Sequence, residues 1–299
     1  MKTYRRAGVL MHITSLPGKY GTGVMGKDAR KFIDSLREMN FRYWQVLPLN
    51  PTDDSGSPYC SYSAFAGNIS LIDPETLFEK GFVSEADIRE CEYSGSIYCT
   101  DHSFAYKTRM TLLKKAFMNI DADSAALIRI FREQNKWAED YAYFMALRDF
   151  YDKKPWWEWE EKHARYAEAQ RCKGNFEEKI AFYVFTQYIF FTQWRSLKEY
   201  ANSNNVFILG DMPIYVSRDS ADVWSDTDSF EINPKSLQPE AVAGVPPDYF
   251  SEDGQLWGNP LYNWKKMKKD GYKWWINRLG CSLKLYDKVR IDHFRAFAS

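Results

Sequence analysis

The segment YDKVRID, residues 286–292, is a short apolar run that ends in an aspartate, and it sets the pattern for the whole fold. Three earlier segments have the same character: GVLMHI (8–13), YWQVLPL (43–49) and VFILGD (206–211). Such runs, expected to be buried on both faces, are typical of strands in a parallel sheet. Residues 27–39 and 272–285 carry apolar side chains at helical spacing. Strand, helix and strand in succession predict an α/β fold.

Residues 101–202 have a different pattern, in which apolar residues recur at helical spacing over long stretches. Four amphipathic helices are predicted, at residues 104–118, 125–132, 137–151 and 176–200. The aromatic stripe of the third helix, Trp137, Tyr141, Phe144 and Tyr151, is interpreted as core packing. We therefore expect residues 1–50 and 203–299 to form the sheet-containing part. Residues 51–202 would then be an inserted loop and a mainly helical subdomain.

Two long segments, residues 50–68 and 241–260, lack a clear secondary-structure pattern. Structureless loops of this length are uncommon in compact domains and are usually functional or disordered. Both segments are rich in Tyr, Phe and Trp, a composition that argues against disorder. We expect each loop to be held in place over a binding site.

Composition excludes several classes of function. The 40 basic and 40 acidic residues cancel, so nothing favours nucleic acid or an anionic membrane as a partner. The longest apolar stretch, residues 180–191, contains Thr186 and Gln187 and is shorter than a bilayer span. Five scattered cysteines without a CxxC pair indicate neither a disulfide framework nor a zinc site. We expect a cytoplasmic protein without a metal or a cofactor.

The segment GTGVMG, residues 21–26, matches the glycine pattern of dinucleotide-binding loops. Residues SLPGKY separate it from the preceding strand, and no acidic residue closes the second strand. A true dinucleotide-binding motif has both features. We interpret the glycines as allowing a tight loop and a close helix start.

Acidic residues stand at the ends of two predicted strands. The fourth strand ends at Asp292 and the third at Asp211. Arg290 and Asp292 are two residues apart, so both side chains project from the same face of the strand. A guanidinium group beside a carboxylate favours the ionised form. A structural ion pair would also explain these residues. A nucleophile or charge-stabilising carboxylate is the functional interpretation, because α/β barrels hold their sites at these strand ends.

Four motifs resemble those of the amylomaltases, which are bacterial 4-α-glucanotransferases related to the α-amylases. The motifs are SPYCSYSAFAGN (57–68), GDMPIYV (210–216), AGVPPDYFSEDGQLWGNPLY (243–262) and VRIDHFR (289–295). They are long and occur in the family's order, and the likeness extends from HITSLPG near the start to the last residue. The resemblance implies a (β/α)8 barrel of the glycosidase kind with a large helical insertion. Four predicted strands would be only about its first half.

The resemblance also implies roles for individual residues. Asp292 matches the catalytic nucleophile, and Arg290 matches the arginine beside it. Residues implied to bind substrate are Ser57, Tyr59, Asp211 and His293, together with Tyr249, Phe250, Gln255 and Trp257 of the loop that covers the glucan.

The implied reaction is transfer of an α-1,4-glucan segment to the 4-hydroxyl of another glucan or of glucose, with retention. Retention needs two carboxyl groups, one of which forms a covalent glycosyl-enzyme. In the family, the acid/base glutamate follows the nucleophile on a later strand. We therefore predict that residues 1–299 alone are inactive. Two alternatives stay open: an amylase-type α-1,4-glucan hydrolase, and a non-catalytic glucan-binding fragment.

Overall fold

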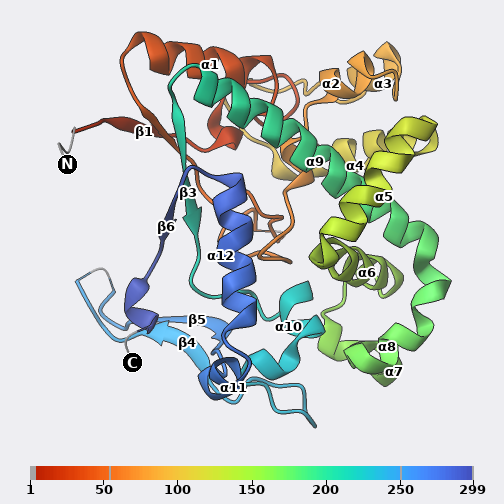
Figure 1. The fold of residues 1–299 in the computed structure, drawn as a ribbon, viewed down its shortest axis with the longest axis vertical. Coiled ribbons are helices and arrows are strands. Elements are labelled where there is room, and N and C mark those ends of the chain that lie inside the picture. Colours follow the sequence, from red (N-terminus) through yellow and green to blue (C-terminus); the bar gives the residue numbers. More distant parts are fainter. Residues whose placement is uncertain (1–4, 54, 250, 298–299) are drawn as a thin grey trace.

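The computed structural model describes residues 5–53, 55–249 and 251–297. A four-stranded parallel sheet lies at one side of the molecule, in the order β1-β2-β3-β6 (Figure 1). Its strands are β1 (Gly8–Leu10), β2 (Tyr43–Gln45), β3 (Phe207–Met212) and β6 (Lys288–Ile291). All four predicted strands are therefore present. β1, β2 and β6 are shorter than their apolar runs, and β3 has the predicted length shifted by one residue. Chain order equals spatial order, as repeated strand-helix-strand connections require.

Helices cover one face of this sheet. Trp44 of β2 is fully buried, and its ring meets Phe32 of α1 (Lys27–Glu38) with the ring centroids 5.2 Å apart. Helices α9 (Glu177–Ser203) and α12 (Lys273–Leu285) also pack against the sheet (Figure 1). On the opposite face Leu10 is 57% exposed, and Arg290 is also exposed. The expectation of strands buried on both faces is wrong for this chain, because the described helices cover a single face.

The helices predicted between β2 and β3 are confirmed, with ends shifted by a few residues. They are α4 (His102–Met118), α5 (Ala122–Gln134), α6 (Lys136–Phe150) and α9. Tyr141 and Phe144 of α6 are buried, as expected for a core stripe, and α6 lies along α9 (Figure 1). Shorter helices complete the chain: α2 (Pro74–Glu79), α3 (Glu85–Arg89), α7 (Glu161–Ala164), α8 (Tyr166–Cys172), α10 (Ala221–Ser225) and α11 (Trp264–Lys269). Within the described residues, no helix combines the length and apolar character needed to cross a membrane.

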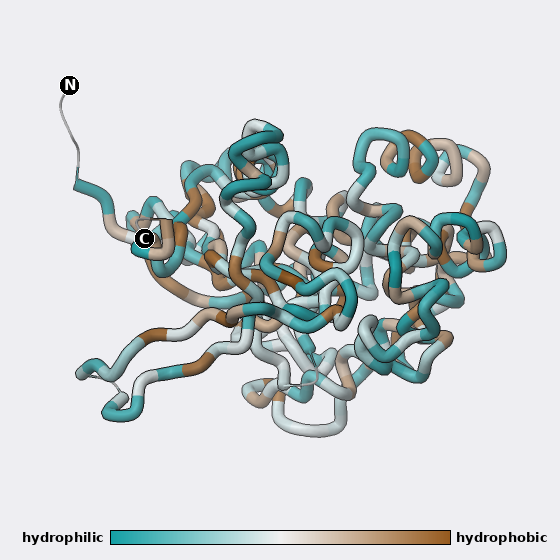
Figure 2. Tube along the Cα trace, turned by 90° about the horizontal axis from the view of Figure 1, so that it is seen from below, coloured by the Kyte–Doolittle hydropathy of each residue, from teal (hydrophilic) through white to brown (hydrophobic). Residues whose placement is uncertain are grey.

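The segment 241–260, expected to be structureless, instead contains an antiparallel hairpin. Its strands are β4 (Val242–Val245) and β5 (Gln255–Pro260). The sequence hid this pairing because neither strand alternates apolar and polar residues cleanly and nine residues separate them. The hairpin reaches out beyond β6 (Figure 1), and its connecting turn is hydrophilic (Figure 2). The part of the turn at residue 250 lies outside the described residues.

Gln187, one of the two polar residues in the apolar stretch of α9, holds the 50–68 loop through hydrogen bonds. Gln187 is fully buried and makes two hydrogen bonds to the backbone of Gly67: its Oε1 accepts from the amide at 2.7 Å, and its Nε2 donates to the carbonyl at 3.2 Å. One and a half turns later, Gln193 bonds both backbone groups of Asp73 in the same way, at 2.7 and 3.1 Å. The Gly67 hydrogen faces Phe190, where a Cβ would lie 2.1 Å from the ring. Helix α9 therefore fixes the end of the 50–68 loop.

Replacing Gln187 with leucine is expected to lower the free energy of unfolding by about 2–6 kcal/mol. Leucine has a similar size, but it leaves a buried N–H and a buried C=O without partners, at about 1–3 kcal/mol each. Urea unfolding measures the loss. Gln134→Leu, at the exposed end of α5, is the control and should change stability by less than about 0.5 kcal/mol. Equal effects of the two substitutions would contradict this role of Gln187.

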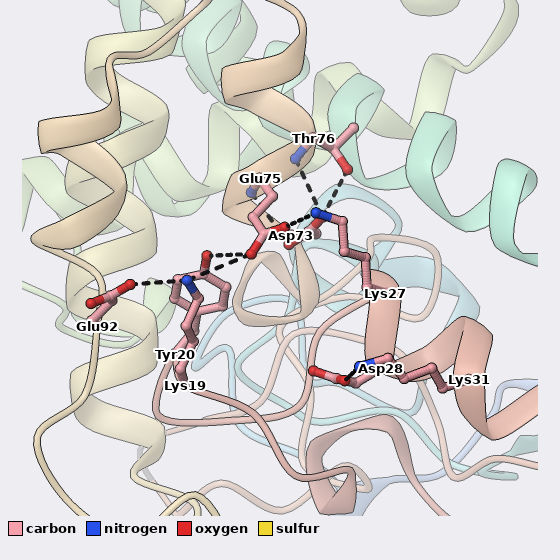
Figure 3. A network of polar contacts seen from close by, with 9 residues as sticks. All are labelled: Lys19, Tyr20, Lys27, Asp28, Lys31, Asp73, Glu75, Thr76 and Glu92. Carbon is pink, nitrogen blue, oxygen red and sulfur yellow. Dashed lines mark hydrogen bonds and ion pairs between the residues drawn. The ribbon is translucent and has the colours of Figure 1, made fainter.

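The GTGVMG segment forms a tight loop, in agreement with its interpretation from sequence. Gly21 has a φ of +75°, and Gly26 precedes α1. A Cβ on Gly26 would lie 2.8 Å from Cγ of Asp73, whose carboxylate caps α2 by accepting from Glu75 and Thr76. Glu75 accepts a hydrogen bond from Lys27 at 2.6 Å, which ties α1 to α2 (Figure 3). These glycines bring two helix starts close together.

Candidate functional site

The carboxyl ends of β3 and β6 bring two aspartates to one arginine. The strand register places Asp211 directly opposite Arg290. The guanidinium group of Arg290 donates to Oδ1 of Asp211 at 2.7 Å and to Oδ1 of Asp292 at 2.5 Å. The side chain of Asp211 is 1% exposed, whereas that of Asp292 is 40% exposed. One arginine thus orients a buried carboxylate and an accessible one.

Tyr59 reaches this group from the 50–68 loop. Its hydroxyl donates to Oδ2 of Asp211 at 2.7 Å. Burial and this hydrogen bond raise the pKa of the Tyr59 phenol, so the proton stays on the tyrosine. The hydrogen bond to Asp211 likewise raises the pKa of Arg290, which remains charged. Both oxygens of Asp211 are therefore engaged, and Asp292 is the carboxylate that offers an open oxygen.

Aromatic rings lie beside the accessible carboxylate. His293, the residue after Asp292, has a left-handed backbone with a φ of 47°, which is uncommon outside glycine. Its ring meets Trp257 of β5 edge to face, with the ring centroids 5.0 Å apart. The indole N–H of Trp257 donates to Oε1 of Gln255 at 3.0 Å. Since Trp257 is 38% exposed, its ring offers an apolar surface of the kind that stacks on sugars.

The other predicted residues are less closely joined to this centre. Ser57 lies in the same loop as Tyr59, and its hydroxyl accepts from the Tyr59 amide at 3.3 Å. Tyr249 stands in the hairpin turn and is 98% exposed. Phe250 lies outside the described residues.

Sequence reasoning did not find the residues that fix the backbone just after Asp211. Arg278 of α12 is buried and donates to the carbonyls of Pro213 at 2.6 Å and Ile214 at 3.1 Å. Tyr262 also donates to the Ile214 carbonyl, at 2.7 Å. These bonds fix the turn that leaves β3. An arginine on a helical stripe of apolar residues, as in Trp275, Arg278 and Leu279, was the available signal.

Tyr215, in the same turn, is a second residue that sequence reasoning missed. Its ring stacks on Tyr262 with centroids 5.9 Å apart and faces Trp257 at 6.3 Å. It therefore links the β3 turn to the aromatic surface on β5. Its position within GDMPIYV, immediately after a strand that ends in an acid, was the signal that could have found it.

The 50–68 loop is also fixed from the β3 side, through a buried acid. The amide of Ala64 donates to Oδ2 of Asp222 of α10 at 2.8 Å. Burial raises the pKa of Asp222 to about 6 from 3.8. The folded protein therefore binds a proton more tightly than the unfolded chain at this residue. Burial of the charged carboxylate therefore does not lower the free energy of unfolding below about pH 4, and lowers it by the full amount above about pH 6.

The parent protein should lose stability as pH rises from about 4 to 6, because Asp222 then becomes charged while buried. We expect the Asp222→Asn variant to keep its stability over this range. A shift of about two pKa units corresponds to about 3 kcal/mol. Asparagine keeps an acceptor for Ala64, so the variant should be more stable than the parent at pH 8 and equal to it near pH 3.5. Urea unfolding across this range measures the difference, with the exposed Asp28→Asn as control. A parent-like pH profile in Asp222→Asn would contradict the assignment.

Among the described residues, no group of three or more His, Cys, Asp or Glu side chains is placed to hold a metal ion. The centre instead consists of carboxylates, one arginine, a phenol and exposed rings at the carboxyl ends of parallel strands. In α/β barrels this is the end that carries the active site. Fold and centre together define an α/β protein of the glycosidase type.

Comparison with known proteins identifies the family. The model of the 4-α-glucanotransferase family matches residues 11–299, and the chain belongs to this family. It is 43% identical over 290 residues to the 4-α-glucanotransferase of Clostridium butyricum, covering 96% of this chain and 60% of that protein. It is 45% identical over 309 residues to that of Thermus thermophilus, covering 99% and 60%. The chain thus spans about three-fifths of the length of these relatives.

Solved structures agree with this result. The chain superposes on the amylomaltase of Streptococcus agalactiae, solved in complex with acarbose, with a TM-score of 0.93 at 42% identity. That match covers 98% of this chain and 60% of the other. The amylomaltase of Corynebacterium glutamicum has a TM-score of 0.75 at 18% identity, covering 97% and 41%, and shares the fold.

Proposed function

We propose that this chain carries the catalytic nucleophile and part of the substrate-binding site of a retaining 4-α-glucanotransferase that acts on α-1,4-glucans. The observation that carries the proposal is the placement of Asp292, which is accessible, held by Arg290 and next to the Trp257 ring. An accessible, oriented carboxylate beside a surface suited to sugars can attack an anomeric carbon. Family membership adds the substrate class.

The proposed reaction has two displacements. In the first, an oxygen of Asp292 bonds to the anomeric carbon as the bond to the leaving glucan oxygen breaks, and an acid protonates that oxygen. In the second, the 4-hydroxyl of an acceptor sugar attacks the same carbon, loses its proton to the conjugate base, and releases Asp292. The anomeric configuration is inverted twice and hence retained.

Asp211 is not suited to the acid/base role in this scheme. Its two oxygens accept from Tyr59 and Arg290, and it is buried with a positive partner. A general acid must present a free, proton-bearing oxygen to the leaving group, whereas both oxygens of Asp211 are occupied by these donors and its side chain is 1% exposed. We therefore propose that Asp211 positions Arg290 and Tyr59, and that the acid/base group lies outside residues 1–299.

Transfer instead of hydrolysis requires a sugar, not water, to reach the covalent intermediate. The rings of Trp257, Tyr215 and His293 form an apolar surface at Asp292, carried partly by the projecting hairpin. A sugar held on these rings would be oriented for attack and would displace water. This arrangement supports transferase over hydrolase activity.

The sheet is proposed to be the first half of a (β/α)8 barrel. Four parallel strands in chain order, with helices on one face, match half of such a barrel, and the segment between β2 and β3 would be its inserted subdomain. Half a barrel leaves unpaired edges at β1 and β6. We propose a cytoplasmic location, since the five cysteines are free thiols.

A chimaera tests this proposal. Residues 1–299 are joined to the remaining part of the Streptococcus agalactiae amylomaltase and incubated with maltotriose, beside residues 1–299 alone. The chimaera should yield glucose and a ladder of longer maltooligosaccharides, and residues 1–299 alone should yield neither. A ladder from residues 1–299 alone would refute their proposed inactivity. Glucose and maltose alone from the chimaera would favour a hydrolase, and binding without turnover would favour a glucan-binding protein.

A further inference from the structure

The amino ends of the four parallel strands carry a group of cations, at the opposite end of the sheet from Asp292. Arg6 precedes β1, Arg42 precedes β2, and Lys288 begins β6. Arg5 stands next to Arg6. In Figure 1 β3 and β6 run toward the β4–β5 hairpin. The basic cluster (Arg5, Arg6, Arg42 and Lys288) stands at the amino ends of the parallel strands, which is the end away from the hairpin.

Two aromatic rings on the uncovered face of the sheet contact two members of the cluster, Arg6 and Lys288. Tyr43 and Phe207 are register partners on β2 and β3, with their ring centroids 6.2 Å apart. The guanidinium carbon of Arg6 lies 5.8 Å from the Phe207 ring, and Nζ of Lys288 lies 4.6 Å from the Tyr43 ring. Contacts with Lys288, and then Arg6, lower the pKa of the Tyr43 phenol. The local field is therefore positive.

Carboxylates do not neutralise this field in the part of the chain that the structure describes. No Asp or Glu oxygen there lies within 4.0 Å of the charged nitrogens of Arg5, Arg6, Arg42 or Lys288. The adjacent acid, Asp287, faces elsewhere: it lies 3.5 Å from Nζ of Lys198 and accepts from the Ile208 amide at 2.7 Å. Four like charges gathered without counter-ions favour binding of an anion.

The cluster also borders a concavity of about 540 Å³. Its walls include Arg5, Arg6, Arg42 and Phe207, together with Asn40 and Asn205. Both asparagines have left-handed backbones at the ends of helices α1 and α9, which turn the chain back toward the strands. Guanidinium groups bind phosphate through paired hydrogen bonds, and amide side chains bind hydroxyl groups. The volume exceeds that of phosphate alone.

We propose that this concavity is a binding site for a phosphate group, of the size that accommodates a hexose monophosphate. Arg6 and Arg42 hold the phosphate, and Asn40 and Asn205 bind the sugar hydroxyls. The site lies at the opposite end of the strands from the proposed catalytic centre and does not depend on the proposed function.

Calorimetric titration of the purified protein at fixed ionic strength tests the site, with inorganic phosphate, glucose 1-phosphate and glucose as separate probes. Saturable binding of either phosphate compound, but not glucose, is expected. Tighter binding of glucose 1-phosphate than of inorganic phosphate identifies a sugar phosphate as the ligand, and equal binding identifies free phosphate; both support the site. Absence of saturable phosphate binding, or equal binding of glucose, overturns it.

Variants locate the binding. Arg6→Gln and Arg42→Gln should each weaken phosphate binding by about tenfold or more, since each removes a charge-assisted hydrogen bond. Arg195→Gln, which removes an exposed arginine on α9, is the matched control and should bind as the parent does. Far-UV circular dichroism verifies that each variant is folded. Parent-like affinity in the double variant Arg6→Gln/Arg42→Gln would place the phosphate elsewhere and refute the proposal.

Discussion

Replacing Asp292 with asparagine is expected to lower the rate of glucan transfer by the chimaera described above roughly 10⁴-fold or more. Glucan binding should persist. Asparagine preserves the shape and can still accept the hydrogen bond from Arg290, but a neutral amide is a poor nucleophile. Removal of a nucleophile costs several orders of magnitude in kcat in enzymes whose catalytic groups act as a unit. Product chromatography measures turnover, and titration with maltotetraose measures binding.

Two controls separate a chemical role from a structural one. Asp228→Asn removes an exposed carboxylate from the turn after α10 and should leave transfer unchanged. Asp292→Ala opens space for azide, which should react with α-glucosyl fluoride in one displacement to give the inverted β-glucosyl azide. Transfer above one-hundredth of the parent rate in Asp292→Asn would rule out a nucleophile at this position.

The relative placement of Arg290, Asp292 and Asp211 could be predicted from the sequence, because it follows from side-chain alternation along a strand and from parallel strand pairing. Side-chain alternation placed Arg290 and Asp292 on one face, and their 2.5 Å hydrogen bond agrees. Asp211 and Arg290 are 79 residues apart, but both stand at strand ends, which parallel pairing brings together. Tyr59 is different: it lies 152 residues from Asp211 in a loop, so only family resemblance pointed to it. Local patterns do not encode where a loop residue lands.

The errors have equally specific causes. The apolar runs predicted strands buried on both faces of the sheet. That prediction was wrong because an apolar run does not show whether helices cover one face of the sheet or both. The β4–β5 hairpin was not predicted because its two strands are stabilised by pairing with each other, and a nine-residue turn with two prolines separates them in the sequence. Arg278 and Gln187 were missed because a buried polar residue in a helix resembles a break in an apolar stripe. The backbone groups that such residues satisfy are visible only in three dimensions.

The proposed division of the chain into a sheet part and an inserted helical part raises the question of whether the two unfold separately. Trp224 of α10 belongs to the 203–299 part, but it is fully buried among rings of the helical part. Its ring centroid lies 5.0–5.9 Å from those of Tyr143, Phe144, Trp159 and Tyr166. Its indole N–H donates to the carbonyl of His163 at 2.9 Å. Both parts therefore share one hydrophobic core.

Trp224→Ala is accordingly expected to lower the free energy of unfolding of the whole chain by about 3–5 kcal/mol, because it leaves a large cavity in this shared core. Unfolding in urea should remain a single transition with an unchanged slope, followed by far-UV circular dichroism and by amide hydrogen exchange in both parts. Trp257→Ala, at an exposed ring, is the control and should cost less than about 1 kcal/mol. Separate transitions for residues 51–202 and for the sheet would show that the core is divided, and that the inserted part is stable without the Trp224 ring.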